Sequence, residues 1–180
     1  MKIAAITALL FSVGSFASAQ MGKESSANTA NPIVTTVRQM EGRYAKNLTG
    51  AADEMPAAKY NYRPTPDQMT FAHLMAHTAE ANYTLCAAVA GEAAPKNNVS
   101  ETDSKETIVK AVKDSFTYCE QVLAKADDSN LGQTVTLWEG HTGTRGSALV
   151  TMAAGWADHY SAAAGYLRLN NLLPPSAAKH

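Results

Sequence analysis

Four stretches of the chain repeat their apolar residues at intervals of three and four positions, and this spacing limits the fold more than any other feature. Residues at such intervals share one face of an α-helix, so each stretch predicts an amphipathic helix of about 18 to 24 residues. Four helices of similar length, each about 30 Å long, indicate an all-α four-helix bundle. The expected inward positions are Ile33, Val37, Met40, Tyr44 and Leu48, then Leu74, His77, Ala81, Leu85 and Ala88, then Ile108, Val112, Phe116, Cys119 and Leu123, and finally Met152, Trp156, His159, Ala163 and Tyr166.

Capping residues and helix breakers set the expected ends of the first two helices. The first helix is expected over residues 32–50, with Asn31 as its N-cap and a proline as its first residue. The second begins either at Thr65, which is followed by proline and then by glutamine at the third helical position, or at Thr70. It should stop at Gly91, a residue type common just after a helix end.

The second half of the chain carries similar signals. Asp103 with Glu106 three residues later is a capping-box pattern that opens the third helix, which should fray near Asp127. Residues 131–145 are rich in glycine and threonine, which predicts a loop holding a short extended piece. The fourth helix is then expected to begin near Gly146 or Ser147.

The N-terminus has the order of a secretory signal peptide: a lysine, an apolar run and an Ala-Ser-Ala sequence. Residues 1–19 are therefore expected to be removed as the protein is exported to the periplasm or the outside of the cell. The apolar run is too short for a comfortable membrane span, so membrane attachment would require that this segment be retained. We expect residues 20–31 to be a flexible lead-in, residues 32–175 to be one domain and residues 176–180 to be a tail.

The charge balance excludes one class of partner. The chain has 15 Lys and Arg against 16 Asp and Glu, a formal net charge of −1, and no basic block. Proteins that bind nucleic acid concentrate positive charge to neutralise phosphates. We therefore expect no nucleic-acid partner.

The two cysteines, Cys86 and Cys119, allow a single intramolecular pairing. An oxidising compartment favours a disulfide, although two buried free thiols are the alternative. If the second and third helices formed a tight antiparallel hairpin, the two residues would lie roughly 20 Å apart and could not pair. The 12-residue connection over 91–102 is long enough to return the chain and make these helices parallel, which would bring the cysteines to the same height.

Three histidines are the candidates for chemistry. His73 and His77 are four residues apart and project from one face of the second helix, while His159 lies within the apolar stripe of the fourth. A third imidazole from a neighbouring helix would complete a metal site with an open position for water or substrate. Trp138 and Trp156 are candidates for the lining of a small-molecule pocket, although aromatic residues at helical spacing more often belong to the core.

Several short motifs resemble the DinB/YfiT-like metalloenzyme family. They occur in the family's order across nearly the whole mature chain. The motifs are Tyr60-Asn-Tyr-Arg-Pro-Thr-Pro66, Leu74-Met-Ala-His-Thr-Ala-Glu-Ala-Asn-Tyr83, His159-Tyr160 and Tyr166-Leu-Arg-Leu-Asn-Asn-Leu-Leu-Pro-Pro175. The resemblance implies a DinB-like bundle with an up-down-down-up course, in which the second and third helices are parallel.

The resemblance also implies a ligand set, and this chain departs from it. Metal-binding members hold a divalent ion with one histidine from the second helix and two from an H-x-x-x-H pair on the fourth. His77 and His159 match two of these positions, but the third position is Gly155, which has no side chain to donate. Either His73 or Glu80 is a candidate replacement, because each lies within one helical turn of His77.

Two functions follow from this incomplete set. The first is an exported enzyme, a hydrolase or thiol transferase by resemblance, that uses one divalent ion such as Zn²⁺ or Ni²⁺ at a degenerate site. The second is a bundle without metal that binds a small-molecule ligand or has a structural role. Relatives often pair, so a homodimer is compatible with both. The sequence names no substrate or reaction.

Overall fold

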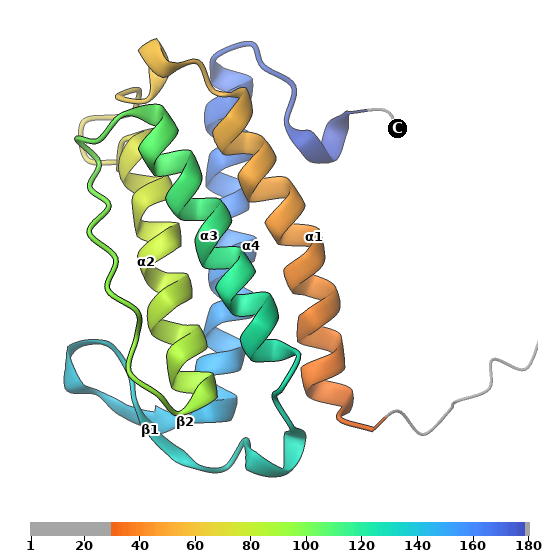
Figure 1. Ribbon diagram of the computed structural model, residues 1–180. Helices are drawn as coiled ribbons and strands as arrows, with labels where there is room; N and C mark the ends of the chain where they lie inside the picture. The colour runs from red at the N-terminus through yellow and green to blue at the C-terminus, as the bar shows by residue number, and fades with distance from the viewer. Residues whose placement is uncertain (1–29, 179–180) are drawn as a thin grey trace, which may run out of the picture.

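The computed structural model describes residues 30–178 and contains four long helices that pack side by side (Figure 1). They are α1 (Pro32–Glu54), α2 (Phe71–Ala90), α3 (Lys105–Leu123) and α4 (Arg145–Leu169). Each helix packs against two others, so that α1 and α2 lie diagonally opposite and both contact α3 and α4. The predicted signal segment and most of the lead-in lie outside the described residues. Within residues 30–178, no helix is both long enough and apolar enough to cross a membrane.

The helices follow the up-down-down-up course that the resemblance implied. In Figure 1, α1 and α4 run from the lower end to the upper end, whereas α2 and α3 run downward. The connection between α2 and α3 climbs the whole length of the bundle, which makes the two helices parallel. Two contacts show the same register, because Asn82 hydrogen-bonds Ser115 and Cys86 pairs with Cys119, both across 33 positions.

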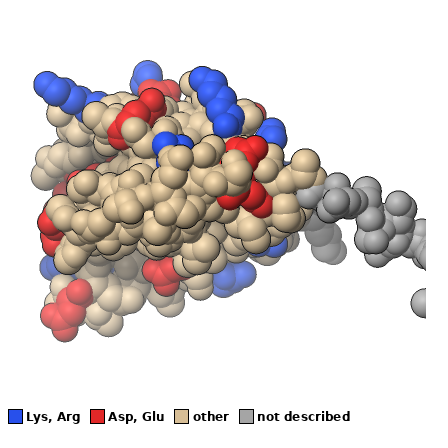
Figure 2. All heavy atoms as spheres, turned by 90° about the horizontal axis from the view of Figure 1, so that it is seen from below, with Lys and Arg blue, Asp and Glu red and all other residues tan. Residues whose placement is uncertain are grey.

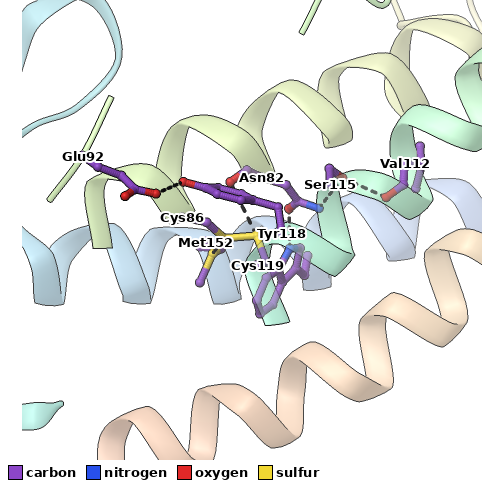
Figure 3. Close-up of a disulfide and its surroundings, with 9 residues drawn as sticks. Asn82, Cys86, Glu92, Val112, Ser115, Tyr118, Cys119 and Met152 are labelled. Atoms are coloured by element: carbon purple, nitrogen blue, oxygen red, sulfur yellow. Dashed lines mark hydrogen bonds between the residues drawn. A yellow bond between two sulfur atoms is a disulfide. The ribbon is translucent and has the colours of Figure 1, made fainter. Parts of the chain in front are cut away.

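Cys86 and Cys119 form a disulfide with their Cα atoms 5.4 Å apart, in the pairing that the sequence allowed (Figure 3). Both residues are fully buried, and Met152 of α4 lies against them, with its Sδ 3.0 Å from Cys86 Sγ. Parallel helices bring the two Cα atoms within bonding range, as the geometric argument required.

The start of α1 differs from its expectation. Asn31 is at the N-cap position, but its backbone is left-handed, with φ of 55°, and its side chain does not cap the helix. The carboxylate of Asp128 instead accepts hydrogen bonds from the backbone N–H groups of Ile33 and Val34 at 2.9 Å each. In addition, the side-chain oxygen of Asn31 accepts a hydrogen bond from the Asp128 backbone N–H. A residue more than 90 positions away therefore closes this helix end.

The other helix starts follow local signals, shifted in two cases by one or more residues. Thr70 caps α2, so the Thr65 alternative was wrong, and Ser104 caps α3 one residue later than predicted. For α4 the cap is Thr144, which forms a reciprocal capping box with Ser147. Each of these side chains accepts from a backbone N–H that the first turn of a helix leaves unpaired.

The expected loop between the third and fourth helices contains a small antiparallel hairpin. Strand β1 (Thr134–Thr136) pairs with β2 (Thr142–Thr144), and Trp138, Glu139 and Gly140 lie at the tip. Glu139 and Gly140 both have positive φ, 52° and 76°, which lets the chain reverse. The hairpin lies at the lower end of the bundle in Figure 1. Figure 2 shows that end as a broad surface without charge, bordered by charged side chains.

The core contains most of the predicted inward positions. On α3 every predicted position is buried, and on α4 every position except His159 is buried. On α1 Val37 and Leu48 are buried and Met40 and Tyr44 are half-buried against the core, whereas Ile33 is 50% exposed and its neighbour Val34 is buried instead. On α2 Leu74, Leu85 and Ala88 are buried, and His77 and Ala81 are half-buried. Near the C-terminus a 3-10 turn (Pro175–Ala177) folds back onto α1.

Candidate ligand pocket at His77 and His159

His77 of α2 and His159 of α4 meet across the interface between these helices. Their ring centroids are 5.1 Å apart and the rings are tilted by 71°, an edge-to-face arrangement. Both side chains are partly exposed, so they border the core without belonging to it. The structure thus brings together the two histidines that matched the family's positions.

Thr78 favours one tautomer of His159. The Thr78 hydroxyl donates its proton to the Leu74 carbonyl at 2.7 Å, so it can serve His159 Nδ1 only as an acceptor, across 3.4 Å. This contact favours the tautomer with the hydrogen on Nδ1, which leaves the lone pair on Nε2. Burial lowers the pKa of His159, and the neighbouring His77 lowers it further, while Asp158 opposes both. The ring is accordingly neutral near pH 7.

Beside the two histidines lies a cavity of about 590 Å³. Gly155 forms part of its wall, and a Cβ added there would meet only His159 Cε1, at an ordinary 3.9 Å. The glycine is therefore not required by crowding, and its missing side chain enlarges the opening. Other lining groups are Trp138 and Glu139 from the hairpin tip, Thr151 from α4, and Glu80, Ala81, Thr84 and Leu85 from α2.

His73 does not join this group. Its Nδ1 lies 3.3 Å from the Glu101 carboxylate, which also accepts from the Thr70 hydroxyl at 3.1 Å. His73 and Glu101 line a smaller cavity between α2 and the connection that leads to α3, on the other side of His77 and Glu80, which border both cavities. The first candidate replacement for the third ligand is thus paired with another group, and its side chain is 46% exposed.

The donor set at the cavity does not fit a three-ligand metal centre. Two carboxylates, Glu80 and Glu139, line the cavity with His77 and His159. Yet in the part of the chain that the structure describes, no three His, Cys, Asp or Glu side chains are grouped so that they could hold a metal ion. Catalytic zinc sites normally use three protein ligands. Two imidazoles beside a glycine fall one ligand short.

Sequence reasoning found part of this site and missed part. His77, His159 and Trp138 were singled out and line the cavity, whereas Trp156 is buried in the core. Thr78 was missed, because a single threonine inside a helix carries no signal of its own. Glu139 was missed as well, because its place depends on how the hairpin folds back.

These features define a class: a four-helix bundle with parallel second and third helices and a histidine-lined cavity between the second and the fourth. A model of the DinB superfamily matches residues 42–163, more than half of the chain. The chain belongs to the DinB superfamily.

Solved structures show the same fold. A variant of the mycothiol-dependent maleylpyruvate isomerase superposes with a TM-score of 0.60 at 12% identity, covering 72% of this chain and 60% of that one. The unsubstituted isomerase superposes with a TM-score of 0.58 at 14% identity, again covering 72% of this chain and 60% of that one. A conserved protein from Enterococcus faecalis gives 0.59 at 15% identity, covering 76% of this chain and 95% of that one. No curated protein sequence matches the chain.

Proposed function

We propose that this protein is an exported, small-molecule-binding member of the DinB superfamily, whose ligand occupies the cavity beside His77 and His159. The observation that carries the proposal is Gly155, which stands where the resemblance expects a metal-binding histidine and leaves that wall of the cavity open. A volume of about 590 Å³ is in the usual range for small-molecule sites. The pair of imidazoles is then a polar anchor rather than two thirds of a metal site.

The lining indicates the chemistry of the ligand. His159 Nε2 is an acceptor with no hydrogen-bond partner within residues 30–178, so it suits a hydroxyl or N–H group on the ligand. Ala81 and Leu85 offer apolar wall, and the Trp138 ring, 43% exposed at the hairpin tip, offers a surface for stacking. A small aromatic molecule with one hydrogen-bond donor fits these groups best.

The competing function is that of a metal-dependent enzyme, as the family resemblance suggests. It needs a third ligand, and Glu80 or Glu139 would have to move toward the histidines to supply one. The isomerase structures add no residue-level support for such an activity, since the similarity is in fold alone and the chain spans about 60% of the isomerase's length. We therefore place the binding function first.

Phenol and toluene are matched probes of the pocket, because they differ by the hydrogen-bond donor. We expect phenol to shift the His159 and Trp138 side-chain NMR resonances saturably, and to bind several-fold more tightly than toluene, since one hydrogen bond is worth about 1 kcal/mol. Gly155→Leu should fill the cavity and abolish binding. Gly165→Leu is the matched control, because that helical glycine also faces open space and lies outside the cavity. Equal phenol binding in both leucine variants would contradict the proposal.

Export is part of the same proposal. Residues 1–19 have the order of a signal peptide, and an oxidising compartment would let Cys86 and Cys119 form their disulfide as the chain folds. Mass spectrometry of the protein recovered from the periplasm or the medium should give a chain that begins near Gln20 and has no thiol that reacts under denaturing conditions. An uncleaved cytoplasmic chain with two reactive thiols would contradict export.

A further inference from the structure

Arg145, the first residue of α4, carries an unpaired donor. Its Nε is the one buried side-chain nitrogen or oxygen atom within residues 30–178 that has no hydrogen-bond partner. Leaving a buried donor unpaired is costly, and the cost is larger for a charged group. An unpaired guanidinium nitrogen in an otherwise satisfied structure therefore indicates that an acceptor belongs there.

The absence of a side chain at Gly91 leaves room for the Arg145 guanidinium. A Cβ at Gly91 would lie 2.3 Å from Nη2 and 3.0 Å from Cζ, so any other residue would displace the guanidinium. Gly91 also has a φ of 75° at the C-cap of α2, which glycine adopts without strain. One residue thus ends the helix and admits the arginine side chain against its backbone.

The helix ends explain where the charge lies but not how its donors are paired. The guanidinium rests at the C-terminal end of α2, where the helix dipole favours a cation. The carbonyls of Ala87 and Ala88, however, already accept from the backbone N–H groups of Gly91 and Glu92. The dipole therefore accounts for the position of Arg145, and a partner for Nε is still required.

Arg145 lines a cavity of about 290 Å³ between the ends of α2, α3 and α4. These three helix ends lie at the lower end of the bundle in Figure 1. Lys125 adds a second cation, and neither cation makes an ion pair within the described part of the chain. The carboxylate in this cavity, Glu92, accepts from the Tyr118 hydroxyl at 2.8 Å, and Figure 3 shows these two groups pointing toward one another. Two cations thus face the cavity against one hydrogen-bonded carboxylate.

We propose that this cavity is a second binding site, which takes a small oxyanion, a carboxylate or a phosphate. An oxyanion is the acceptor that a guanidinium fork matches best, and in this cavity Lys125 supplies a further positive charge beside Arg145. The site shares no lining residue with the cavity at His77 and His159. It is therefore independent of the function proposed for that cavity.

The direct test follows the side-chain Nε–Hε resonance of Arg145 in ¹⁵N-labelled protein. Inorganic phosphate and succinate are titrated separately at constant ionic strength, with chloride as the balancing anion. We expect a saturable shift of this resonance by at least one of the two probes and no such shift by chloride. Tighter binding of phosphate would identify a phosphate site, and tighter binding of succinate a carboxylate site.

Variants separate specific binding from general charge attraction. Arg145→Gln should weaken binding roughly tenfold or more. Lys125→Gln should weaken it by a smaller factor without altering the fold, since the Lys125 ammonium makes no ion pair within residues 30–178. Arg168→Gln removes an exposed positive charge at the other end of α4 and should leave affinity unchanged. The proposal is overturned if neither probe gives a saturable shift, or if Arg168→Gln weakens binding as much as Lys125→Gln does.

Discussion

Two adjacent stripes of α4 have opposite properties. The tied stripe consists of Met152, which packs against the disulfide, and Trp156, whose indole N–H donates to the buried amide oxygen of Asn82. The open stripe, Thr151, Gly155 and His159, begins one residue earlier and faces the 590 Å³ cavity. A shift of one position around the helix thus separates a packed interface from a binding surface.

The two stripes differ in how firmly hydrogen bonds hold their side chains. Asn82 accepts from Trp156 Nε1–H at 2.7 Å and donates to Ser115 at 3.0 Å, so one amide joins three helices beside the disulfide (Figure 3). Within residues 30–178 the His159 side chain has a single hydrogen bond, to Thr78, and it is a long one of 3.4 Å. One face of these helices therefore stabilises the fold, and a neighbouring face is open to a ligand. Four substitutions test this difference.

Removing the disulfide should have the largest effect. We expect the double substitution Cys86→Ala with Cys119→Ala to lower the free energy of unfolding by about 3 to 4 kcal/mol, because the crosslink closes a loop of 33 residues in the unfolded chain. Denaturant titration of the variant against the oxidised protein checks this. A loss below about 1 kcal/mol would show that the tied stripe does not depend on the crosslink.

Trp156→Phe removes the indole N–H from the hydrogen-bond network and keeps an aromatic ring in the core. The substitution leaves Asn82 Oδ1 buried without its donor, so we expect a loss of about 1 to 3 kcal/mol. His77→Phe, at the border of the cavity, is the matched substitution on the open side. It should lower the free energy of unfolding by less than Trp156→Phe does. The distinction between the two stripes fails if the two variants unfold at the same denaturant concentration.

Gly155→Ala should stabilise the protein. The added Cβ would lie 3.9 Å from His159 Cε1, an ordinary van der Waals distance. Alanine inside a helix also stabilises the folded state by about 0.5 to 1 kcal/mol relative to glycine. Gly50→Ala in α1 is the control with less room, because its Cβ would lie 2.9 Å from Pro175 Cγ. The midpoint temperature of thermal unfolding should rise for Gly155→Ala and not for Gly50→Ala. A lower midpoint for Gly155→Ala would mean that the open stripe is tightly packed.

The smallest effect is the pH dependence that comes from His159. Its folded pKa is depressed, mainly by burial, so the unfolded chain binds more protons around and below pH 6.5. Stability from this group is therefore present above pH 6.5 and is lost as the pH falls. His159→Gln should flatten the stability profile in that window, as measured by urea unfolding at a series of pH values. An unchanged slope would place His159 in a solvated environment.

Sequence patterns predicted the bundle well because they are local. Apolar spacing located the inward positions of α3 without error, and the cysteine argument led to parallel second and third helices. The cap of α1 was not predictable, because Asp128 reaches it from a distant segment. The site followed the same rule, since matched positions identified His77 and His159, whereas Glu139 reaches the cavity through the hairpin.

The measurement that tests the central claim most directly is zinc binding by calorimetry. It compares the tag-free protein with Gly155→His, which restores the family's H-x-x-x-H pair at a position with room for a side chain. We predict no tight stoichiometric site in the natural sequence and an affinity at least roughly a hundredfold higher in the variant, lost again on His77→Ala. Tight stoichiometric zinc binding by the natural sequence that requires both His77 and His159 would contradict the account.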